Sequence, residues 1–546
     1  MKKFNHLLFI LLSLTVIVTA CQKEAADCIL YNGSIFTADS VSSYVEALAI
    51  KDGKIVAVGT SADIIKLAGT NTKRIDLKGN LVIPGINDAH YHLSPNPIGT
   101  QLKLPQQEPT WEEVVVQIKA TTAKEKAGNW ILGIIGGNVV LNPEANRSSL
   151  DKLCPNNPVL LGTYFGHGFI MNTKAMQDMG IAETETDPFG GRYERVGNSK
   201  VLNGKFYEYA SWNFLRQLAE RTPDEVAMQQ YKAYGDEALQ FGITSVQNMA
   251  FFPTERFLKV WDKANIPIRM HAIRFPSTSK DARMVKEGRD LPFMPFKDKP
   301  IKVMGTKWIL DGTPIERGAA FRNAYKDTPN WYGRLDFNQA EIELMVRECL
   351  DWKDQLLVHC AGDKPVEVLF NAMKKVGPSI NWQQKRFRIE HGDGVVEDLI
   401  PRTKELGVVI VQNPAHLTLV DIYQTRYGKN SPFFSLKTFL DKGIPLALGS
   451  DGLLNPYLNI MFAAINPDRP TEAITREQAV RAYTYGSAFA EFEETTKGTL
   501  TIGKIADLAI LSQNIFKVPL NDLPKTTSIL TMIEGKVVFD AKKLAY

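Results

Sequence analysis

The stretch Leu81–Pro95, LVIPGINDAHYHLSP, begins as an apolar run and ends in two histidines, His90 and His92, that are separated by a single residue. Successive side chains of a β-strand point to opposite faces, so residues i and i+2 share one face. If the run is a strand, both imidazoles therefore point into the same space at its C-terminal end. The pair alone fits two interpretations: metal ligands, or two polar residues where a strand meets solvent.

Downstream of this stretch, short apolar runs alternate with helical patterns, which is typical of βαβ units in a parallel sheet. Eight such runs match the strand number of a (β/α)₈ barrel. We therefore predict an α/β fold, with a (β/α)₈ TIM barrel over residues 83–496. The eight runs are Leu81–His92, Ile243–Gln247, Ile266–Ile273, Ile301–Leu310, Gln355–Cys360, Phe387–His391, Val408–Gln412 and Ile444–Asp451.

The two ends of the chain are also rich in strand-like runs, with Asn-Gly and Asp-Gly turn signals between them. We expect residues 21–82 and 497–546 to build one small β-sandwich domain together. A third segment, about 93–236, is too long for a simple crossover and contains two further strand-like runs, WILGIIGG (130–137) and PVLLGTYFG (158–166). This segment is predicted to be an inserted subdomain after the first barrel strand.

Residues 1–20 have the pattern of a signal peptide. Two lysines, Lys2 and Lys3, precede the apolar stretch Leu7–Val18, which is short for a membrane span. The sequence VTAC, ending in Cys21, resembles the bacterial lipobox, although Val18 replaces the more usual leucine. We therefore expect a lipoprotein of the bacterial cell envelope, on the periplasmic or surface side, held to the membrane by a lipid on Cys21. A cleaved secretory signal with an incidental cysteine is the alternative.

The composition is that of a large globular protein with balanced charge. The 546 residues are 44% hydrophobic and carry a net charge of +4, with no basic stripe or long charge run. Nucleic acid is therefore not expected as a partner. The other cysteines do not form a CxxC motif, and their irregular spacing predicts no disulfide pattern; they are Cys28, Cys154, Cys349 and Cys360.

The ends of the predicted strands give meaning to the opening histidine pair, because barrel enzymes carry their chemistry at the C-terminal ends of the strands. Four of the eight histidines lie at or near such ends, and an aspartate closes the last run. Imidazole and carboxylate are the ligands of catalytic Zn²⁺, which keeps an open position for water. The residues at these ends are His90, His92, Lys307, His359, His391 and Asp451.

Five strings in this order resemble the amidohydrolase superfamily: DAHYH (88–92), TKWILDG (306–312), HCAGD (359–363), RIEH (388–391) and GSDG (449–452). The branch that they resemble contains N-substituted formamide deformylase-like enzymes, amidohydrolase family 3. Three further strings also fit this branch, so the resemblance spans nearly the whole chain after the signal peptide. They are GHGFIMNTKAM (166–176), VLNGKFYE (201–208) and GTLTIGKIADLAIL (498–511).

The resemblance implies a centre of two divalent metal ions, with Zn²⁺ as the default. One ion would be held by His90, His92 and Asp451, and the other by His359 and His391. Lys307, carboxylated by CO₂, would bridge the two ions.

An unmodified lysine would repel cations, because with a pKa of about 10.4 only about one lysine in 2,500 is neutral at pH 7. Burial favours the neutral amine, and its carbamate is an anionic ligand. The alternative for Lys307 is a strand lysine paired with Asp311.

The activity implied by the resemblance is hydrolysis of a carbon–nitrogen bond, other than a peptide bond, in a small-molecule amide, formamide or cyclic amide. A metal-bound water, with its pKa lowered from about 15.7 towards about 7, would supply hydroxide. Asp451 would act as the general base and then as the acid towards the leaving nitrogen. Two alternatives remain open. A mononuclear deaminase is disfavoured by Gly362, where such enzymes carry glutamate; a non-catalytic metal- or solute-binding lipoprotein is disfavoured by the complete ligand set.

Three residues are candidates for contact with substrate. His416, in VQNPAHL after the seventh run, matches a position that the family uses near substrate; a surface-loop histidine is the alternative. His167 matches another, but Phe165 stands where the family often has an acid, which favours an apolar wall. Trp308, with Tyr164 and Phe165, suits an apolar or aromatic substrate group, although such residues are more often core.

Other polar residues on or near the runs are expected to be structural. His271, in the middle of its run, is interpreted as a satisfied barrel histidine. Asp88, Asp311 and Asp363 are expected to orient loops or other side chains rather than to bind metal.

Overall fold

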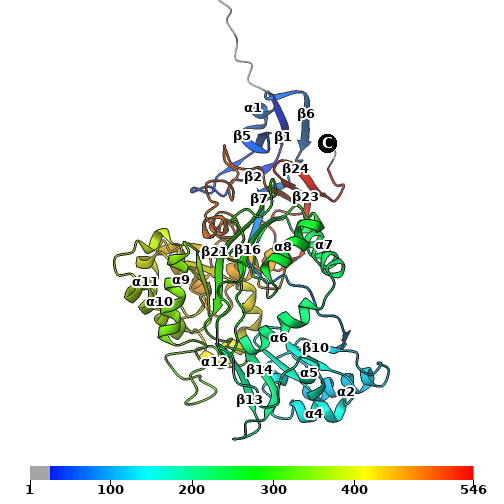
Figure 1. Ribbon diagram of the computed structural model, residues 1–546. Helices are drawn as coiled ribbons and strands as arrows, with labels where there is room; N and C mark the ends of the chain where they lie inside the picture. Colours follow the sequence, from blue (N-terminus) through cyan, green and yellow to red (C-terminus); the bar gives the residue numbers. More distant parts are fainter. Residues whose placement is uncertain (1–24, 545–546) are drawn as a thin grey trace, which may run out of the picture.

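The computed structural model describes residues 25–544. The predicted signal peptide and the lipidation site Cys21 lie outside the described residues. Among residues 25–544, no helix is both long enough and apolar enough to cross a membrane. Figure 1 shows a β-rich unit at one end of the molecule, a barrel in the middle and an α/β unit at the other end.

The middle of the molecule is an eight-stranded parallel sheet whose strands follow one another in sequence order. Most of its strands are buried along their whole length, as expected for a parallel sheet that is covered on both faces. The predicted barrel is therefore confirmed. Its strands are β8 (Ile86–Tyr91), β15 (Ile243–Asn248), β16 (Arg269–Arg274), β17 (Ile301–Ile309), β18 (Leu356–Cys360), β19 (Arg388–His391), β20 (Val409–Gln412) and β21 (Leu446–Leu448).

The first and last strands, β8 and β21, approach each other and nearly close the barrel. The backbone N–H of Asp451 donates to the carbonyl oxygen of His90 at 2.9 Å. A Cβ atom on Gly449 would lie 2.6 Å from the backbone nitrogen of His90, so only glycine permits this approach. The closure places the end of β21 directly beside the histidine pair of β8.

The opening run, Leu81–His92, is two strands rather than the single barrel strand that we predicted. Its first half, β7 (Leu81–Pro84), pairs with strands of the β-rich unit, and only β8 enters the barrel. The break falls at Gly85, where a Cβ atom would collide with the side chain of Thr244. β7 (LVIP) is wholly apolar and β8 (INDAHY) is mixed, but both are buried almost throughout, so the change of sheet is a change of strand pairing and not of burial.

The β-rich unit combines both ends of the chain in two sheets with a shared core. Leu30 and Ile50 from the N-terminal part pack in one cluster with Leu508 and Leu530 from the C-terminal part. One sheet has β5 (Lys54–Gly59), β4 (Ala47–Lys51), β1 (Ala26–Tyr31) and β6 (Ala68–Asp76). The other has β24 (Lys536–Asp540), β23 (Ser528–Ile533), β22 (Leu508–Leu511), β7, β2 (Ser34–Phe36) and β3 (Tyr44–Val45).

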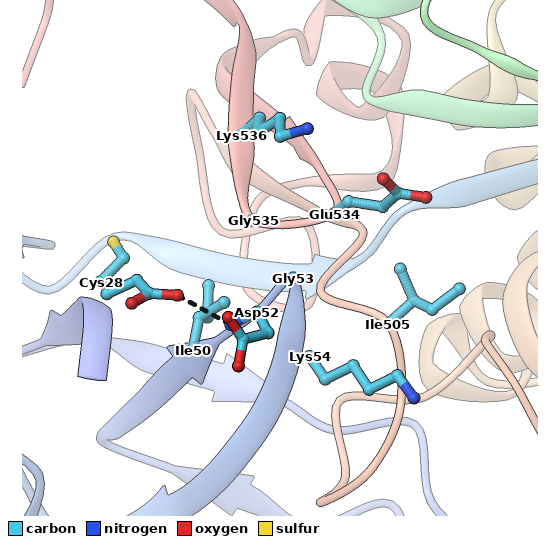
Figure 2. A pocket seen from close by; sticks show the side chains of 10 residues that line it. Cys28, Ile50, Asp52, Gly53, Lys54, Ile505, Glu534, Gly535 and Lys536 are labelled. Atoms are coloured by element: carbon cyan, nitrogen blue, oxygen red, sulfur yellow. Dashed lines mark hydrogen bonds between the residues drawn. The ribbon is translucent and has the colours of Figure 1, made fainter. Parts of the chain in front are cut away.

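A cavity of about 580 Å³ opens in this unit and is lined by Cys28, Gly53, Glu534 and Lys536, among others (Figure 2). Burial raises the pKa of the Cys28 thiol to about 11, so the thiol is protonated at neutral pH and is a poor nucleophile. The four cysteines of the described chain are free and buried.

The inserted segment forms a six-stranded sheet at the opposite end of the molecule from the β-rich unit (Figure 1). The two strand-like runs that did not fit the barrel lie in this sheet as β10 and β11. Its strands are β13 (Gly191–Arg195), β14 (Leu202–Glu208), β12 (Gly168–Met171), β11 (Val159–Thr163), β10 (Ile131–Ile135) and β9 (Thr100–Gln101). Its longer helices are α2 (Trp111–Thr122), α4 (Arg147–Leu153), α5 (Thr173–Asp178) and α6 (Tyr209–Glu220).

Helices follow most of the barrel strands, as the sequence pattern predicts, although none lies in the described stretch between β16 and β17. In α9 (Gln339–Asp351) the buried residues Ile342, Met345, Val346 and Cys349 recur at helical spacing, and Asn338 and Glu341 form a capping box. The others are α7 (Asp224–Gln240), α8 (Thr254–Ala264), α10 (Asp363–Val376), α11 (Leu399–Leu406), α12 (Val420–Tyr427), α13 (Leu436–Asp441) and α14 (Pro456–Ile465).

Candidate metal centre

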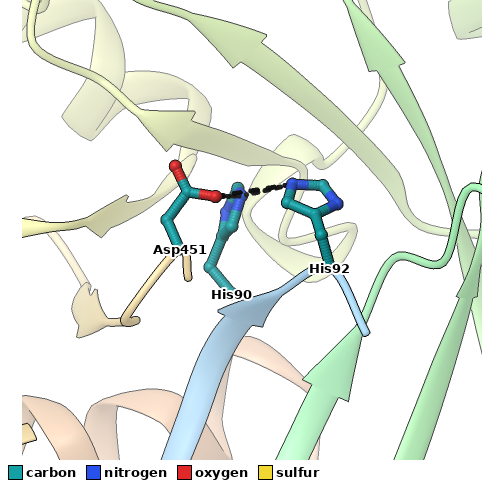
Figure 3. Close-up of side chains that lie close together, drawn as sticks. All are labelled: His90, His92 and Asp451. Carbon is teal, nitrogen blue, oxygen red and sulfur yellow. Dashed lines mark hydrogen bonds and ion pairs between the residues drawn. The ribbon is translucent and has the colours of Figure 1, made fainter. Parts of the chain in front are cut away.

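The histidine pair of β8 and the aspartate after β21 meet at the C-terminal ends of the barrel strands (Figure 3). His90 Nε2 lies 3.1 Å from His92 Nε2, and Asp451 Oδ1 lies 3.4 Å from the first and 3.6 Å from the second. Ligand atoms around a tetrahedral ion with bonds of about 2.05 Å are roughly 3.3 Å apart. These three side chains therefore have the spacing of a shared cation site.

Two further histidines, His359 at β18 and His391 at β19, lie next to this group. Their ring centroids are 4.4 Å apart, and the ring of His391 is 4.9 Å from that of His90. His391 Nδ1 lies 3.9 Å from Asp451 Oδ2, so Asp451 faces both histidine pairs. The structure thus gathers at one place the histidines and the aspartate that the sequence singled out at four strand ends.

The backbone turns sharply at two of these residues. His391 has φ +66° and Asp451 has φ +48°, which is the left-handed region that non-glycine residues rarely adopt. Each lies where its strand ends and is followed by a glycine that also has positive φ. Such conformations persist where the surrounding structure holds them, often at functional sites.

The histidines of β8 are held in place by partners outside the group. His90 Nδ1 lies 2.5 Å from Glu390 Oε2, and Glu390 accepts from the Arg388 guanidinium at 2.7 Å. His92 Nδ1 lies 2.8 Å from the carbonyl oxygen of Met249. With Nδ1 engaged in this way, Nε2 of each ring is free to face a cation, which is the usual arrangement of metal-binding histidines.

Lys307 projects from β17 into the same region and is fully buried. Its Nζ has no hydrogen-bond partner among the described residues, and burial lowers its pKa to about 8. The alternative that pairs it with Asp311 is not what the structure contains. Asp311 instead accepts from the backbone N–H groups of Ala320, Ala361 and Gly362. A buried, unpaired amine is costly, so this side chain requires a partner that the protein part alone does not supply.

The protonation states suit metal ligands. Burial, with the neighbouring imidazoles, lowers the pKa of His92 to about 3 and the pKa values of His359 and His391 well below the ordinary range. These rings are therefore neutral at pH 7. Burial alone would raise the pKa of Asp451, but the neighbouring His90 and the hydrogen bond with His416 outweigh it and hold that pKa well below its usual range. The carboxylate is therefore ionised.

His416 and His167 lie beside the group, from two different sides. His416 Nε2 is 3.3 Å from Asp451 Oδ2, and its ring stacks on that of His391 with centroids 5.5 Å apart. His167 comes from the insert, and its ring centroid is 4.8 Å from that of His359. Both positions are close enough for contact with a substrate that reaches the centre.

Trp308 is placed differently from these two histidines. It is 1% exposed and packs against Tyr209 and Phe337. Neighbouring residues of a strand face opposite sides. Since Lys307 points into the barrel, Trp308 points outward, towards the helices. The structure therefore favours the core interpretation of Trp308.

Several residues around the group were not predicted. Arg388 and Glu390 lie two apart on β19 and so share a face, a signal that the sequence contained in RIEH. Asp393 is buried, with a pKa that burial raises to about 7, and it lies within the electrostatic influence of His416. Glu208 of the insert lies 2.8 Å from His167 Nδ1, a pairing between two separate strings of the sequence.

Comparison with known proteins places these residues in a family. A model described as "Amidohydrolase family" matches residues 73–539. The chain is 27% identical to the protein LONG AFTER FAR-RED 3 of Arabidopsis thaliana, over 94% of this chain and 92% of that protein. It is 24% identical to an N-substituted formamide deformylase of Arthrobacter pascens, over 95% of this chain and 99% of that one. An uncharacterized metal-dependent hydrolase from Pyrococcus furiosus has the same fold, with a TM-score of 0.65, 24% identity and coverage of 90% of this chain and 100% of that structure.

Proposed function

This chain belongs to the amidohydrolase family and is a hydrolase acting on carbon–nitrogen bonds, and from this premise we propose that it cleaves a small-molecule amide, formamide or cyclic amide at a two-metal centre. The residues that would hold the two divalent ions, Zn²⁺ by default, are His90, His92, Lys307, His359, His391 and Asp451. The name of the Arthrobacter pascens relative makes N-substituted formamides the first substrates to test.

The single observation that carries the proposal is the state of Lys307. Lys307 is fully buried and has no partner among the described residues. It lies beside four histidines, of which three are neutral and the fourth, His90, is bonded to Glu390 through Nδ1. With a pKa lowered to about 8, its amine is neutral far more often than an exposed lysine at pH 7. The neutral Nζ can attack CO₂ and lose a proton to give a carbamate, which would help to hold the ions. The group thereby changes from a repelling cation to an anionic ligand.

The other residues would carry the protons and the substrate. When bound, the ions lower the pKa of water from about 15.7 towards about 7 and polarise a carbonyl oxygen. Asp451, ionised in the resting protein, would accept the proton of the attacking water and pass it to the leaving nitrogen. His416, beside Asp451, would donate a hydrogen bond to the oxygen on which negative charge develops.

The test combines composition with activity. Purified protein is expected to contain two divalent ions per chain, and the Lys307 peptide in the intact protein should carry the added mass of one CO₂. A panel of N-substituted formamides, simple amides and cyclic amides is then assayed for released amine and acid. Asp451→Asn should lose turnover, whereas the matched control Asp441→Asn, on the exposed face of α13, should retain it.

Three results would contradict this proposal in different ways. One ion per chain with an unmodified Lys307 would exclude the two-metal version. Release of ammonia from an amino-substituted ring, without amide cleavage, would favour a deaminase. Tight metal or solute binding with no turnover of any substrate would favour a binding protein.

We also propose that the protein is a lipoprotein of the cell envelope, anchored through Cys21. The support is the sequence pattern of residues 1–21, with two lysines, an apolar stretch and VTAC. A Cys21→Ser variant is expected to leave the membrane fraction, whereas a wild-type protein that is already released would overturn the proposal.

A further inference from the structure

A second cavity, of about 180 Å³, lies between the insert and the loop that follows β17. Strands β13 and β14 form one wall, and residues 312–336 form the other. Its lining carries charges of both signs. The residues that matter are Glu208, Glu316 and Asp336, together with Arg192, Arg334 and Gly312.

The acidic residues form the inner end of this cavity. Glu208 is 7% exposed and Glu316 is 8% exposed. A Cβ atom on Gly312 would collide with Oε1 of both carboxylates, so the two groups converge over this glycine. Asp336 also lines the cavity, and its Oδ2 is buried without a hydrogen-bond partner among the described residues.

These carboxylates have acceptor capacity to spare. Glu316 accepts from the backbone N–H and the hydroxyl of Thr313, and Glu208 engages His167 Nδ1. Each ionised carboxylate offers about four acceptor positions, so several remain unused. Burial and the neighbouring acids raise the pKa values of Glu208 and Asp336 well above the ordinary range, and the nearby arginines offset this only in part. A bound ammonium group would favour the ionised form of these carboxylates.

The two arginines form the outer end of the cavity. Arg334 is exposed and Arg192 is partly exposed, with its guanidinium 4.1 Å from the centroid of the Tyr207 ring. Within residues 25–544, neither guanidinium forms an ion pair with a carboxylate. The third arginine of the lining, Arg317, is bound to Asp327 and is not available.

We propose that this cavity binds a small zwitterion of the α-amino acid class, with its ammonium group among Glu208, Glu316 and Asp336 and its carboxylate at Arg192 and Arg334. The order of charges from inside to outside, negative and then positive, is complementary to such a molecule. A guanidinium is a fitting partner for a carboxylate because its N–H groups match the two oxygens. The volume, about 180 Å³, is well above what a single water needs and leaves room for a small organic molecule.

The ligand would lie next to the metal centre. His167 joins the two places, since its Nδ1 lies 2.8 Å from Glu208 while its ring packs against His359. Gly312, in the cavity wall, also provides the carbonyl oxygen that lies 3.3 Å from His359 Nε2. The binding site does not depend on the reaction proposed above, and it can be measured without substrate.

The experiment measures binding of alanine to the purified protein by titration calorimetry. Propylamine and propionate, each with one of the two charges, serve as probes for the ends of the cavity. Alanine is expected to bind more tightly than either probe, and Asp336→Asn and Arg334→Met should each weaken its binding by about tenfold or more. The matched control Arg221→Met, an exposed arginine of the insert outside the cavity, should leave binding unchanged.

The outcomes separate the possible occupants. Because Arg334 is exposed, its variant keeps the test valid even if Asp336→Asn fails to fold. Retained alanine binding in Asp451→Asn would support a site distinct from the metal centre. The proposal would be overturned if wild type did not bind alanine at millimolar concentration. It would also be overturned if Asp336→Asn and Arg334→Met both bound alanine as tightly as wild type. If wild type binds a third equivalent of divalent metal and Glu316→Gln does not, the occupant of the cavity is a metal cation and not a zwitterion.

Discussion

Two lysines on the same strand, β17, have opposite surroundings. Lys302, near the start of the strand, lies 2.9 Å from Glu491 and 3.1 Å from Glu493. Lys307, near the end of the strand, has no partner among the residues of the described chain. Both side chains are buried. A buried lysine therefore has charged partners at one end of the barrel and none at the other, among the described residues.

The difference extends to the residues around each lysine. Glu491 is also 2.8 Å from Lys497 and 3.3 Å from His271, and we name Lys302, His271, Glu491 and Lys497 the paired cluster. We name the six candidate metal ligands the unpaired cluster. In the paired cluster the protein supplies every counter-charge, as a structural ion network requires. In the unpaired cluster the Lys307 amine has no partner among the described residues, and imidazole nitrogens face one another at the spacing of metal ligands. The lysine without a protein partner is thus the one that stands among candidate metal ligands.

The largest expected effect comes from replacing the unpaired lysine. Lys307→Met should lower kcat/KM by about a thousandfold or more, because several kcal/mol of metal-dependent stabilisation are lost and each 1.36 kcal/mol is about tenfold. Measured with chelator present in both proteins, the free energy of unfolding should not fall, since the change removes a buried amine without a partner among the described residues. Steady-state kinetics and urea unfolding measure the two quantities. Activity above a tenth of wild type would remove Lys307 from the centre.

The paired lysine should give the reverse result. Lys302→Met leaves Glu491 with one counter-charge fewer, and breaking a buried pair costs about 3–5 kcal/mol of unfolding free energy. Metal content and kcat of the folded fraction should stay at wild-type values. Urea unfolding and metal analysis check both parts. A loss of metal with unchanged stability would mean that the two clusters are not separate.

Removal of metal tests the same separation without a mutation. A chelator should lower the unfolding free energy of wild type by about 3 kcal/mol for each bound ion that is present at roughly a hundred times its Kd. Lys302→Met should show the same decrease, because effects at separate sites add. His90→Asn should show much less, since it has lost a ligand. Thermal or urea unfolding with and without chelator provides the comparison.

The sequence predicted the barrel and the meeting of the six residues well, for a physical reason. The ends of parallel strands lie at one edge, so residues far apart in sequence had to meet once the strands were identified. It set the domain boundary at residues 82–83, close to the break at Gly85, but assigned the whole run Leu81–His92 to one barrel strand, because apolar character does not reveal a change of partner strand. It also missed Glu390 and Glu208, whose roles depend on which histidine ring each one reaches. That information belongs to the packed structure rather than to any local pattern.

The smallest expected effect concerns acid, and it belongs to the paired cluster. Burial lowers the pKa of His271 in the folded protein. Below a pH of about 6.5, the pKa of histidine in the unfolded chain, the unfolded state therefore binds a proton that the folded state does not bind. The unfolded state then binds more protons, and stability falls as the pH falls from about 6.5 towards the folded pKa. One proton corresponds to about 1.4 kcal/mol per pH unit. Wild type should therefore lose stability more steeply than His271→Gln by this amount.

The measurement is the unfolding free energy between pH 6.5 and 5, for both proteins, with and without chelator. Glu491, whose charged partners hold its pKa well below the ordinary range against burial, loses its contribution only below the unfolded pKa of about 4.3, so it stays outside this window. His271 is bound to Glu491 and to the carbonyl oxygen of Met304 and is not a member of the unpaired cluster. The difference in slope should therefore be the same whether or not metal is present. A difference that appears only after chelation would show that the two ends of the barrel titrate as one system.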